Sequence, residues 1–227
     1  MLLFLVFSFA TVAQTPSQDS EPKIIDSQDY VMPQAVADAG IDGKVLLEMT
    51  IDENGVPTKA SIFAGPRWPC GKNPSGALKE LAKTLTATML GAKFSPAMKD
   101  GKPIQKDINV TIELNNPNFP AKALDVGGAI VLGRAKNLDP DVTLGKPKKM
   151  PLPRYPAGAR ANRAGGAVLA QILIDEKGNV IRSGAIRGHR ELQQSARETA
   201  CEAKFTPTLR SGQPIPVSGL IVYNFVP

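Results

Sequence analysis

Apolar and polar residues alternate in two stretches of the chain that lie 123 positions apart. The alternating apolar positions are Val45, Leu47, Met49 and Ile51 in the first stretch and Val168, Ala170, Ile172 and Ile174 in the second. A period of two predicts a β-strand that buries one face. Each stretch runs into a turn sequence, Asp-Glu-Asn-Gly at 52–55 and Asp-Glu-Lys-Gly at 175–178, and a further strand-like segment follows. Both stretches therefore predict a β-hairpin.

A helical pattern and a closing strand follow each hairpin. The apolar positions of the two helices are Leu78, Leu81, Leu85 and Met89 in the first copy and Leu192, Ala196, Ala200 and Ala203 in the second. Both helices run into Lys-Phe-x-Pro and Gly-x-Pro-Ile, 111 positions apart, where proline prevents the helix from continuing. The closing strands place Ile108, Val110, Ile112 and Leu114, or Ile221, Tyr223 and Phe225, on one face. In the second copy Leu220 and Val222 make the other face apolar as well.

These elements predict an α+β protein with two tandem modules, each an antiparallel sheet of about three strands packed against a helix. We place the first module at residues 30–114 and the second module at residues 148–227. Residues 115–147 have the Pro, Asn and Gly content of a linker, but the apolar run ALDVGGAIVLGRA favours packing of part of it on a module. The polar residues 14–29 predict a flexible segment.

The two copies differ at two places. Before its long helix the first copy has about a dozen additional residues, AGPRWPCGKNPSG, which include Trp68 and Cys70. The second copy has Tyr155 and Arg160 ahead of its first strand, where the first copy has Met32 and Ala37. The shared residues are those that a sheet and a hairpin require. The unshared residues are the candidates for a role that only one copy has.

The first thirteen residues, MLLFLVFSFATVA, are apolar and end in small residues. This pattern is typical of a secretory signal with cleavage after Ala13, so we expect the protein to be exported. A helix of this length rises about 20 Å, which is short of the hydrocarbon core of about 30 Å. An upstream start with basic residues would instead make this segment an inner-membrane anchor.

The composition is ordinary for a globular protein, with 42% hydrophobic and 21% charged residues. The net charge of +6 is uneven: residues 145–227 hold 13 Lys and Arg against 5 Asp and Glu, whereas residues 14–144 hold 14 against 16. The second half is therefore either weakly attracted to anionic envelope surfaces or a solvated basic face. Nucleic acid is not an expected partner, because the chain has no recognition motif and exported proteins rarely meet it.

Cys70 and Cys201 are the two cysteines of the chain, one in each module. Export to an oxidising compartment would permit a disulfide between them. The alternative is two independent small apolar residues, since the sequence does not give the distance between them.

The sequence contains no constellation that we would assign to catalysis, to a metal or to another cofactor. His189 is the single histidine, and it stands at a predicted helix start without partners for acid–base chemistry or metal binding. Turn propensity explains Asp52 and Asp175. Arg160 either binds an anion or makes a structural pairing ahead of the first strand. We therefore do not expect an enzyme.

The second copy resembles the C-terminal domain of TonB, the bacterial energy transducer. The shared positions are Tyr155, Pro156, Ala159 and Arg160 at the opening, Gly166, Ile174, Asp175 and Gly178 along the hairpin, and Phe205, Pro207, Gly212 and Pro214 at the close. The first copy is similar from Gly43 onward and looks like a degenerate second copy of the same module.

The resemblance implies a periplasmic module that grips an extended segment, the TonB box, of an outer-membrane TonB-dependent transporter, or another envelope protein. The grip is strand addition, in which the segment pairs with an exposed sheet edge. By this analogy the partner-binding residues are Pro153, Arg154, Tyr155, Pro156, Leu220, Val222 and Asn224.

Two further expectations follow from the resemblance. A structural module or a homodimer, with the outer apolar face of the closing strand packed on the other copy, is the alternative to peptide binding. Energy transduction is not favoured, because residues 1–13 are too short to span a membrane and a long proline-rich arm is missing.

Overall fold

The computed structural model of the protein describes residues 19–116, 124–125 and 140–226, without the side chains of 124–125. The expected signal at residues 1–13 lies outside these residues, and so does most of the apolar run in the linker. Among the described residues, no helix combines the length and the apolar character needed to cross a membrane.

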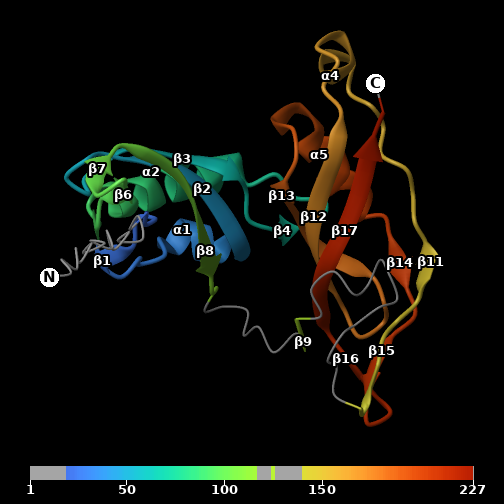
Figure 1. Cartoon of the computed structure of the whole chain (residues 1–227). Helices are drawn as coiled ribbons and strands as arrows, with labels where there is room; N and C mark the ends of the chain where they lie inside the picture. Colours follow the sequence, from blue (N-terminus) through green and yellow to red (C-terminus); the bar gives the residue numbers. More distant parts are fainter. Residues whose placement is uncertain (1–18, 117–123, 126–139, 227) are drawn as a thin grey trace, which may run out of the picture.

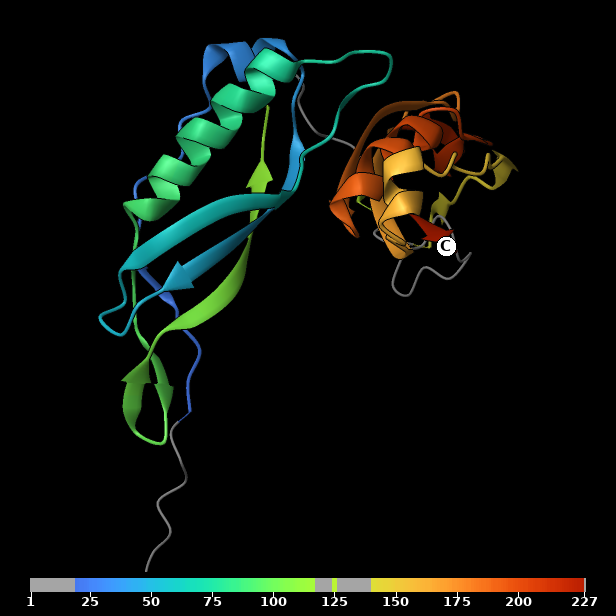
Figure 2. The same ribbon diagram turned by 90° about the horizontal axis from the view of Figure 1, so that it is seen from above.

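The first module is an antiparallel sheet with one long helix across one face (Figure 2). Its elements are α1 (Gln34–Asp38), β2 (Gly43–Ile51), β3 (Pro57–Ala64), α2 (Ser75–Leu90), β5 (Lys93–Phe94), β6 (Ala97–Lys99), β7 (Lys102–Ile104) and β8 (Lys106–Leu114). The strand order is β3-β2-β8, and β6 and β7 form a separate two-stranded hairpin. The alternating residues of β2 and the apolar stripe of α2 form the core, as their periodicity predicts.

The second module repeats this arrangement and confirms the predicted α+β class. Its elements are α4 (Ala157–Ala161), β12 (Gly166–Ile174), β13 (Val180–Arg187), α5 (Arg190–Ala200), β14 (Lys204–Phe205), β15 (Thr208–Arg210), β16 (Gln213–Ile215) and β17 (Val217–Phe225). The central strands have the order β13-β12-β17, and α5 packs on one face through buried Leu192, Ala196 and Ala200.

Two short strands from outside the second module extend its sheet to five strands. β4 (Trp68–Pro69), from the additional residues of the first module, pairs with β13, and β9 (Leu124–Asp125), from the linker, pairs with β17 (Figure 1). About three strands were expected in this sheet. The difference arises because an edge strand offers unpaired N–H and C=O groups that any nearby extended segment satisfies.

A lead-in strand precedes each module and pairs with its Lys-Phe segment. β1 (Ile24–Asp26) pairs with β5, and β11 (Pro147–Lys149) pairs with β14 at the equivalent place. β10 (Val142–Thr143) likewise pairs with β15. Within the segment 14–29, which we predicted to be flexible, residues 24–26 thus form backbone pairs with β5. The structural repeat is longer than the sequence repeat.

The shared turn glycine and the shared phenylalanine meet in both modules. The Gly55 carbonyl accepts a hydrogen bond from the Phe94 N–H at 3.1 Å, and the Gly178 carbonyl accepts one from the Phe205 N–H at 2.8 Å. Both glycines have positive φ, +80° and +86°. A Cβ at either position would lie 2.0 or 2.1 Å from the phenylalanine carbonyl oxygen, so no other residue fits without displacing the backbone. Two motifs far apart in sequence therefore specify one contact.

Candidate functional site

The closing strand β17 forms one side of the second module's sheet. It pairs with β12 over its full length without a register shift. On its outer side β9 pairs only with Val217 and Ser218. From Gly219 to Phe225, this outer edge has no strand pairing in the part of the chain that the structure describes. These backbone groups are available to an added strand.

The outward side chains of β17 have unequal surroundings. Leu220 is half-buried and lines a small cavity between the modules, together with Lys44 and Gln171. Val222 is 42% exposed, and Asn224 is exposed. The expected contact of this face with the other copy therefore involves the start of the strand, while its end is open to solvent.

Tyr155 and Arg160, which the first copy lacks, contact each other. The Arg160 guanidinium lies 5.3 Å from the centre of the Tyr155 ring, and this ring packs edge-on against Phe225 with 5.7 Å between ring centres. The Tyr155 hydroxyl donates a hydrogen bond to the Ala164 carbonyl. Arg160 thus makes a structural pairing, a cation–π contact with Tyr155 that holds residues 153–156, which we call the lead-in segment, at the end of β17.

The other residues predicted ahead of the sheet lie on the same lead-in segment. The Arg154 carbonyl accepts a hydrogen bond from the Ser195 hydroxyl of α5, and the Arg154 side chain is exposed. Pro153 is half-buried, and Pro156, also half-buried, is the N-cap residue of α4. This group adjoins the Phe225 end of β17. The Leu220 side chain lies near the other end, about 17 Å away at the rise of an extended strand.

The predicted motif residues hold the backbone in place. Asp175 accepts two backbone hydrogen bonds in its turn, at 3.0 and 2.7 Å. Gly166 and Gly212 have positive φ, +106° and +79°. Phe205 is buried, Pro207 is half-buried, and Pro214 is exposed opposite Leu209 in the β15-β16 hairpin. His189 is exposed and caps α5 by accepting a hydrogen bond from the Glu191 N–H at 3.4 Å.

The opposite edge of the sheet, β13, is covered by the additional residues of the first module. Trp68 and Pro69 pair with Ser183 and Arg182, and the Cys70 N–H donates to the Ile181 carbonyl at 3.0 Å. We call residues 65–74 the strap. A Cβ on Gly184 would lie 2.0 Å from the Pro66 carbonyl oxygen, so the strap lies directly against β13.

A disulfide and a buried arginine fix the strap. Of the two alternatives open for the cysteines, the structure has the bridge: Cys70 and Cys201 form a disulfide with Cα atoms 5.6 Å apart. The Arg197 guanidinium lies 3.9 Å from the centre of the Trp68 ring and donates to the Pro69 carbonyl at 3.1 Å. Burial lowers the pKa of Arg197, and Glu198 partly offsets this effect.

A buried ion network joins the modules beside the strap. Asp42 accepts hydrogen bonds from Arg67 Nε and from Arg182 Nη1, both at 2.8 Å. All three residues are buried. Arg67 also donates to the Ile172 carbonyl at 3.4 Å. The Asp42 carboxylate of the first module thus forms ion pairs with one arginine of the strap and one arginine of the second module.

The amide of Gln171 adds a second polar link between the modules. Its Oε1 accepts from the Lys44 N–H at 3.0 Å, and its Nε2 donates to the Lys44 carbonyl at 2.8 Å. Sequence reasoning noticed the additional residues around Trp68 but assigned them no role. Their length and their single Trp and Cys were the available signals, while nothing in the local sequence indicated the pairing of Asp42 with Arg182.

The sequence matches the family model described as Gram-negative bacterial TonB protein C-terminal over residues 30–115 and again over residues 151–227. The chain belongs to the TonB C-terminal family. Two matches confirm the tandem copies, and the first match shows that the degenerate copy is a member as well. Comparison with curated proteins gave no match.

Membership makes this chain a TonB-like protein-interaction protein of a family whose members work in the cell envelope. TonB C-terminal modules are interaction modules rather than enzymes. Among the described residues, no group of three or more His, Cys, Asp or Glu side chains has the arrangement of a metal site. The chemistry available at β17 is backbone hydrogen bonding, with Val222 and Asn224 alongside.

Proposed function

We propose that this TonB-like protein acts in the periplasm and binds an extended segment of an outer-membrane TonB-dependent transporter along the outer edge of β17. The observation that carries the proposal is the open edge from Gly219 to Phe225 in a module whose other edge is occupied by the strap. Within the described residues, the outer edge of β17 is therefore the place where a strand can be added to this sheet.

The surroundings of β17 support this placement. Val222 and Asn224 project beside the open edge, where alternate side chains of an added strand would contact them. The lead-in segment, with Arg154 exposed, borders the Phe225 end of the strand through Tyr155. Side chains therefore flank the edge at the end that lies away from the first module.

Export to the periplasm is part of the same proposal. The apolar residues 1–13 would direct it, and the disulfide between Cys70 and Cys201 suits an oxidising compartment. Fractionation of cells that express the full chain tests this step, with the protein expected in the periplasmic fraction and shortened by the signal.

Amide hydrogen exchange of the full chain tests strand addition directly. Synthetic peptides that carry the TonB boxes of outer-membrane transporters are added, and exchange is measured residue by residue. We expect outward-facing amides in 219–225 to exchange at least about tenfold more slowly with bound peptide. Absence of protection, while a known TonB C-terminal domain binds the same peptides, would overturn the proposal.

A pair of variants locates the binding edge. Val222→Lys places a flexible charge beside the edge and is expected to weaken peptide binding about tenfold. Val56→Lys is the matched control, because Val56 is 53% exposed on the first module's hairpin. Equal affinities for the two variants would place the peptide elsewhere.

The second candidate is a structural envelope module without peptide binding. The half-buried Leu220 at the module interface and the pairing of β9 with β17 favour it. It predicts no exchange protection by any peptide. Its homodimeric form predicts a concentration-dependent mass in sedimentation, which the peptide-binding monomer would not show.

A further inference from the structure

The disulfide between Cys70 and Cys201 joins the two modules at places that lie outside both hydrophobic cores. Cys70 belongs to the strap, and Cys201 is the C-cap residue of α5. Each module has a core of its own, and neither core has a cysteine among its buried residues. The bridge connects positions that are 131 residues apart in the sequence. Breaking it would therefore change how the modules are connected and leave both cores in place.

The two cysteines differ in their surroundings. Cys201 lines a cavity of about 420 Å³ between the strap and α5, whereas Cys70 packs against the core of the second module. The lining of this cavity also includes the exposed residues Lys72 and Asn73 of the strap and Glu198 of α5. Solvent therefore enters the cavity, and a dissolved thiol can approach the disulfide from the side of Cys201.

Charge distinguishes the two sulfurs in the same sense. Thiol–disulfide exchange leaves a negative thiolate on the sulfur that departs. On Cys201 this charge would lie at the C-terminal, negative end of α5 and in the same cavity as the Glu198 carboxylate. On Cys70 it would lie next to Pro69, whose carbonyl accepts a hydrogen bond from the Arg197 guanidinium at 3.1 Å. Cys70 is therefore the better leaving group, and Cys201 is the sulfur to attack.

The part of the strap that follows Cys70 has little else to hold it to the second module. The last backbone contact with β13 is the hydrogen bond from the Cys70 N–H to the Ile181 carbonyl, and residues 71–74 have no strand pairing in the part of the chain that the structure describes. A second cavity, of about 280 Å³, lies between these residues and the end of α1. Lys72 and Asn73 line both cavities, so this part of the strap has room to move.

We propose that the Cys70–Cys201 disulfide is a site of thiol–disulfide exchange, which a protein dithiol opens at Cys201. A thiolate of the dithiol attacks the Cys201 sulfur, the bond to Cys70 breaks, and Cys70 leaves as a thiolate that takes a proton from water. The second thiol of the dithiol then attacks the mixed disulfide and releases Cys201, which is protonated in turn. The dithiol is oxidised to a disulfide and the protein gains two electrons. Residues 70–74 of the strap are then released from the second module.

A monothiol identifies the sulfur that is attacked. The full chain is mixed with mercaptoethanol, the reaction is stopped early with N-ethylmaleimide, and peptide mass spectrometry locates both labels. We expect mercaptoethanol on Cys201 and maleimide on Cys70, in at least about tenfold excess over the reverse pattern. Equal amounts of the two patterns would show that the cavity does not direct the attack.

Trp68 is the single tryptophan of the chain, and its fluorescence reports on the strap. The Arg197 guanidinium covers its ring, and its Nε1–H donates a hydrogen bond to the Lys72 carbonyl at 3.0 Å. Reduction of the full chain with dithiothreitol should shift the Trp68 emission to longer wavelength, because the ring becomes more exposed to water when residues 70–74 leave. The Cys70 amide should exchange its hydrogen at least about tenfold faster.

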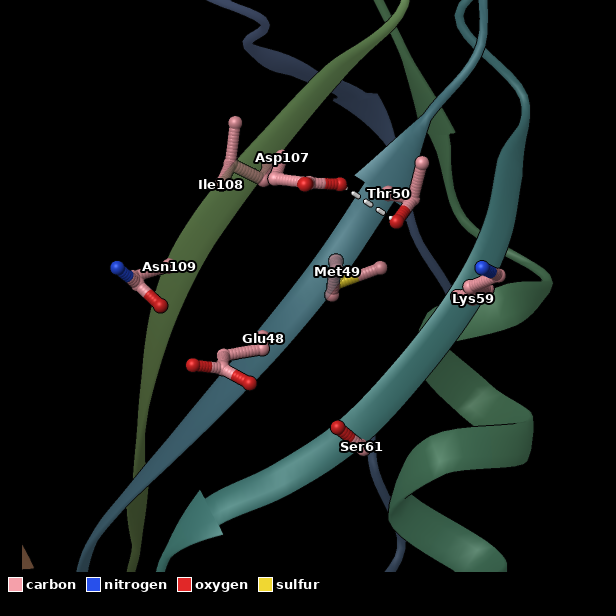
Figure 3. Close-up of a pocket in the computed structure, with 8 residues that line it drawn as sticks. All are labelled: Glu48, Met49, Thr50, Lys59, Ser61, Asp107, Ile108 and Asn109. Carbon is pink, nitrogen blue, oxygen red and sulfur yellow. Dashed lines mark hydrogen bonds between the residues drawn. The ribbon is translucent and has the colours of Figure 1, made fainter. Parts of the chain in front are cut away.

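The first module's sheet supplies reference amides for this measurement. The polar groove around Glu48 and Asp107, on the sheet face that α2 does not cover, has no strap residue in its lining (Figure 3). Amide exchange of residues 107–109, and of α5 in the second module, should therefore stay unchanged on reduction. A chain with both Cys70→Ser and Cys201→Ser should have the emission of the reduced protein without any thiol, and dithiothreitol should not change it further.

Three further results would overturn this inference. They are a disulfide that dithiothreitol reduces only after denaturation, a Trp68 emission that stays constant after complete reduction, and loss of protection throughout α5. The last result would mean that reduction unfolds the second module instead of releasing the strap. Each of these results leaves the proposed function of β17 standing, since peptide protection of residues 219–225 is measured with the disulfide intact.

Discussion

The two modules carry the same sheet, yet one has an open outer face and the other has that face covered. Glu48 and Gln171 are equivalent central-strand positions, opposite Asn109 and Leu220 respectively. Glu48 is exposed over an open groove, whereas Gln171 is 5% exposed and bonded to the first module. The same position therefore faces solvent in one module and the module interface in the other.

The difference is explained by the contacts of the residues that only one copy has. Tyr155 and Arg160 contact each other, and the strap residues Trp68 and Cys70 contact the second module. The first copy has Met32 in place of Tyr155, and Met32 packs against the first module's core. Shared residues thus build each sheet, and unshared residues decide which edges and faces remain open.

The largest expected effect comes from breaking the link between the modules. Asp42→Ala removes the carboxylate that Arg67 and Arg182 share in a buried site. Losing one side of a buried ion network is expected to lower the free energy of unfolding by about 4 kcal/mol, measured by urea denaturation. The exposed pair of Glu21 and Lys106 provides the control.

Glu21→Ala in this control should change stability by no more than about 0.5 kcal/mol, since exposed ion pairs contribute little. A cost for Asp42→Ala as small as that of Glu21→Ala would show that the modules are held together without the buried network.

The second largest expected loss of stability comes from substituting the turn glycine Gly178. This substitution tests whether the glycine is needed for the close approach of Phe205 or only for its positive φ. Gly178→Ala introduces a Cβ 2.1 Å from the Phe205 carbonyl oxygen at φ +86°, and should cost about 3 kcal/mol. Gly212→Ala has a similar φ, +79°, with open space around the new Cβ, and should cost about 1 kcal/mol. Thermal and urea unfolding compare them. Equal costs would contradict the contact between the two motifs.

The smallest expected change in stability comes from an inner position of the closing strands. This position is Ile112 in the first module and the equivalent Tyr223 in the second. The Tyr223 hydroxyl is buried and has no hydrogen-bond partner among the described residues. Tyr223→Phe should therefore be neutral or stabilise the protein by up to about 1 kcal/mol. A clear loss of stability at neutral pH would show that the hydroxyl has a partner.

The same variant has a predicted pH dependence. Burial, reinforced by Glu202, raises the pKa of Tyr223 to about 12 from its ordinary value of 10.0. Below pH 10 the hydroxyl is neutral in both the folded and the unfolded chain, so it causes no pH dependence. As the pH rises toward 12 the unfolded chain ionises first, and the free energy of unfolding falls. Tyr223→Phe should remove this alkaline loss in urea denaturation between these pH values.

Periodicity predicted the modules because a half-buried strand and an amphipathic helix each impose a characteristic spacing of apolar residues on the local sequence. The predicted apolar positions of β2, β12, α2 and α5 are buried as their spacing required, apart from Leu78 of α2, which is partly buried against the core. No such pattern in the sequence indicates which side chains of the candidate site face the other module and which face solvent. Leu220 and Val222 have equivalent places in the pattern, but one faces the first module and the other faces solvent.

The sequence by itself determined the two sheets, their turns and their family, because these depend on side-chain period, glycine conformation and contacts repeated in each copy. The tertiary structure alone decided which edges are open. That outcome depends on the strap reaching β13, on the disulfide between Cys70 and Cys201, and on Asp42 meeting Arg182. Backbone edges accept any neighbouring strand, so only the arrangement of the modules determines which edge remains for a partner.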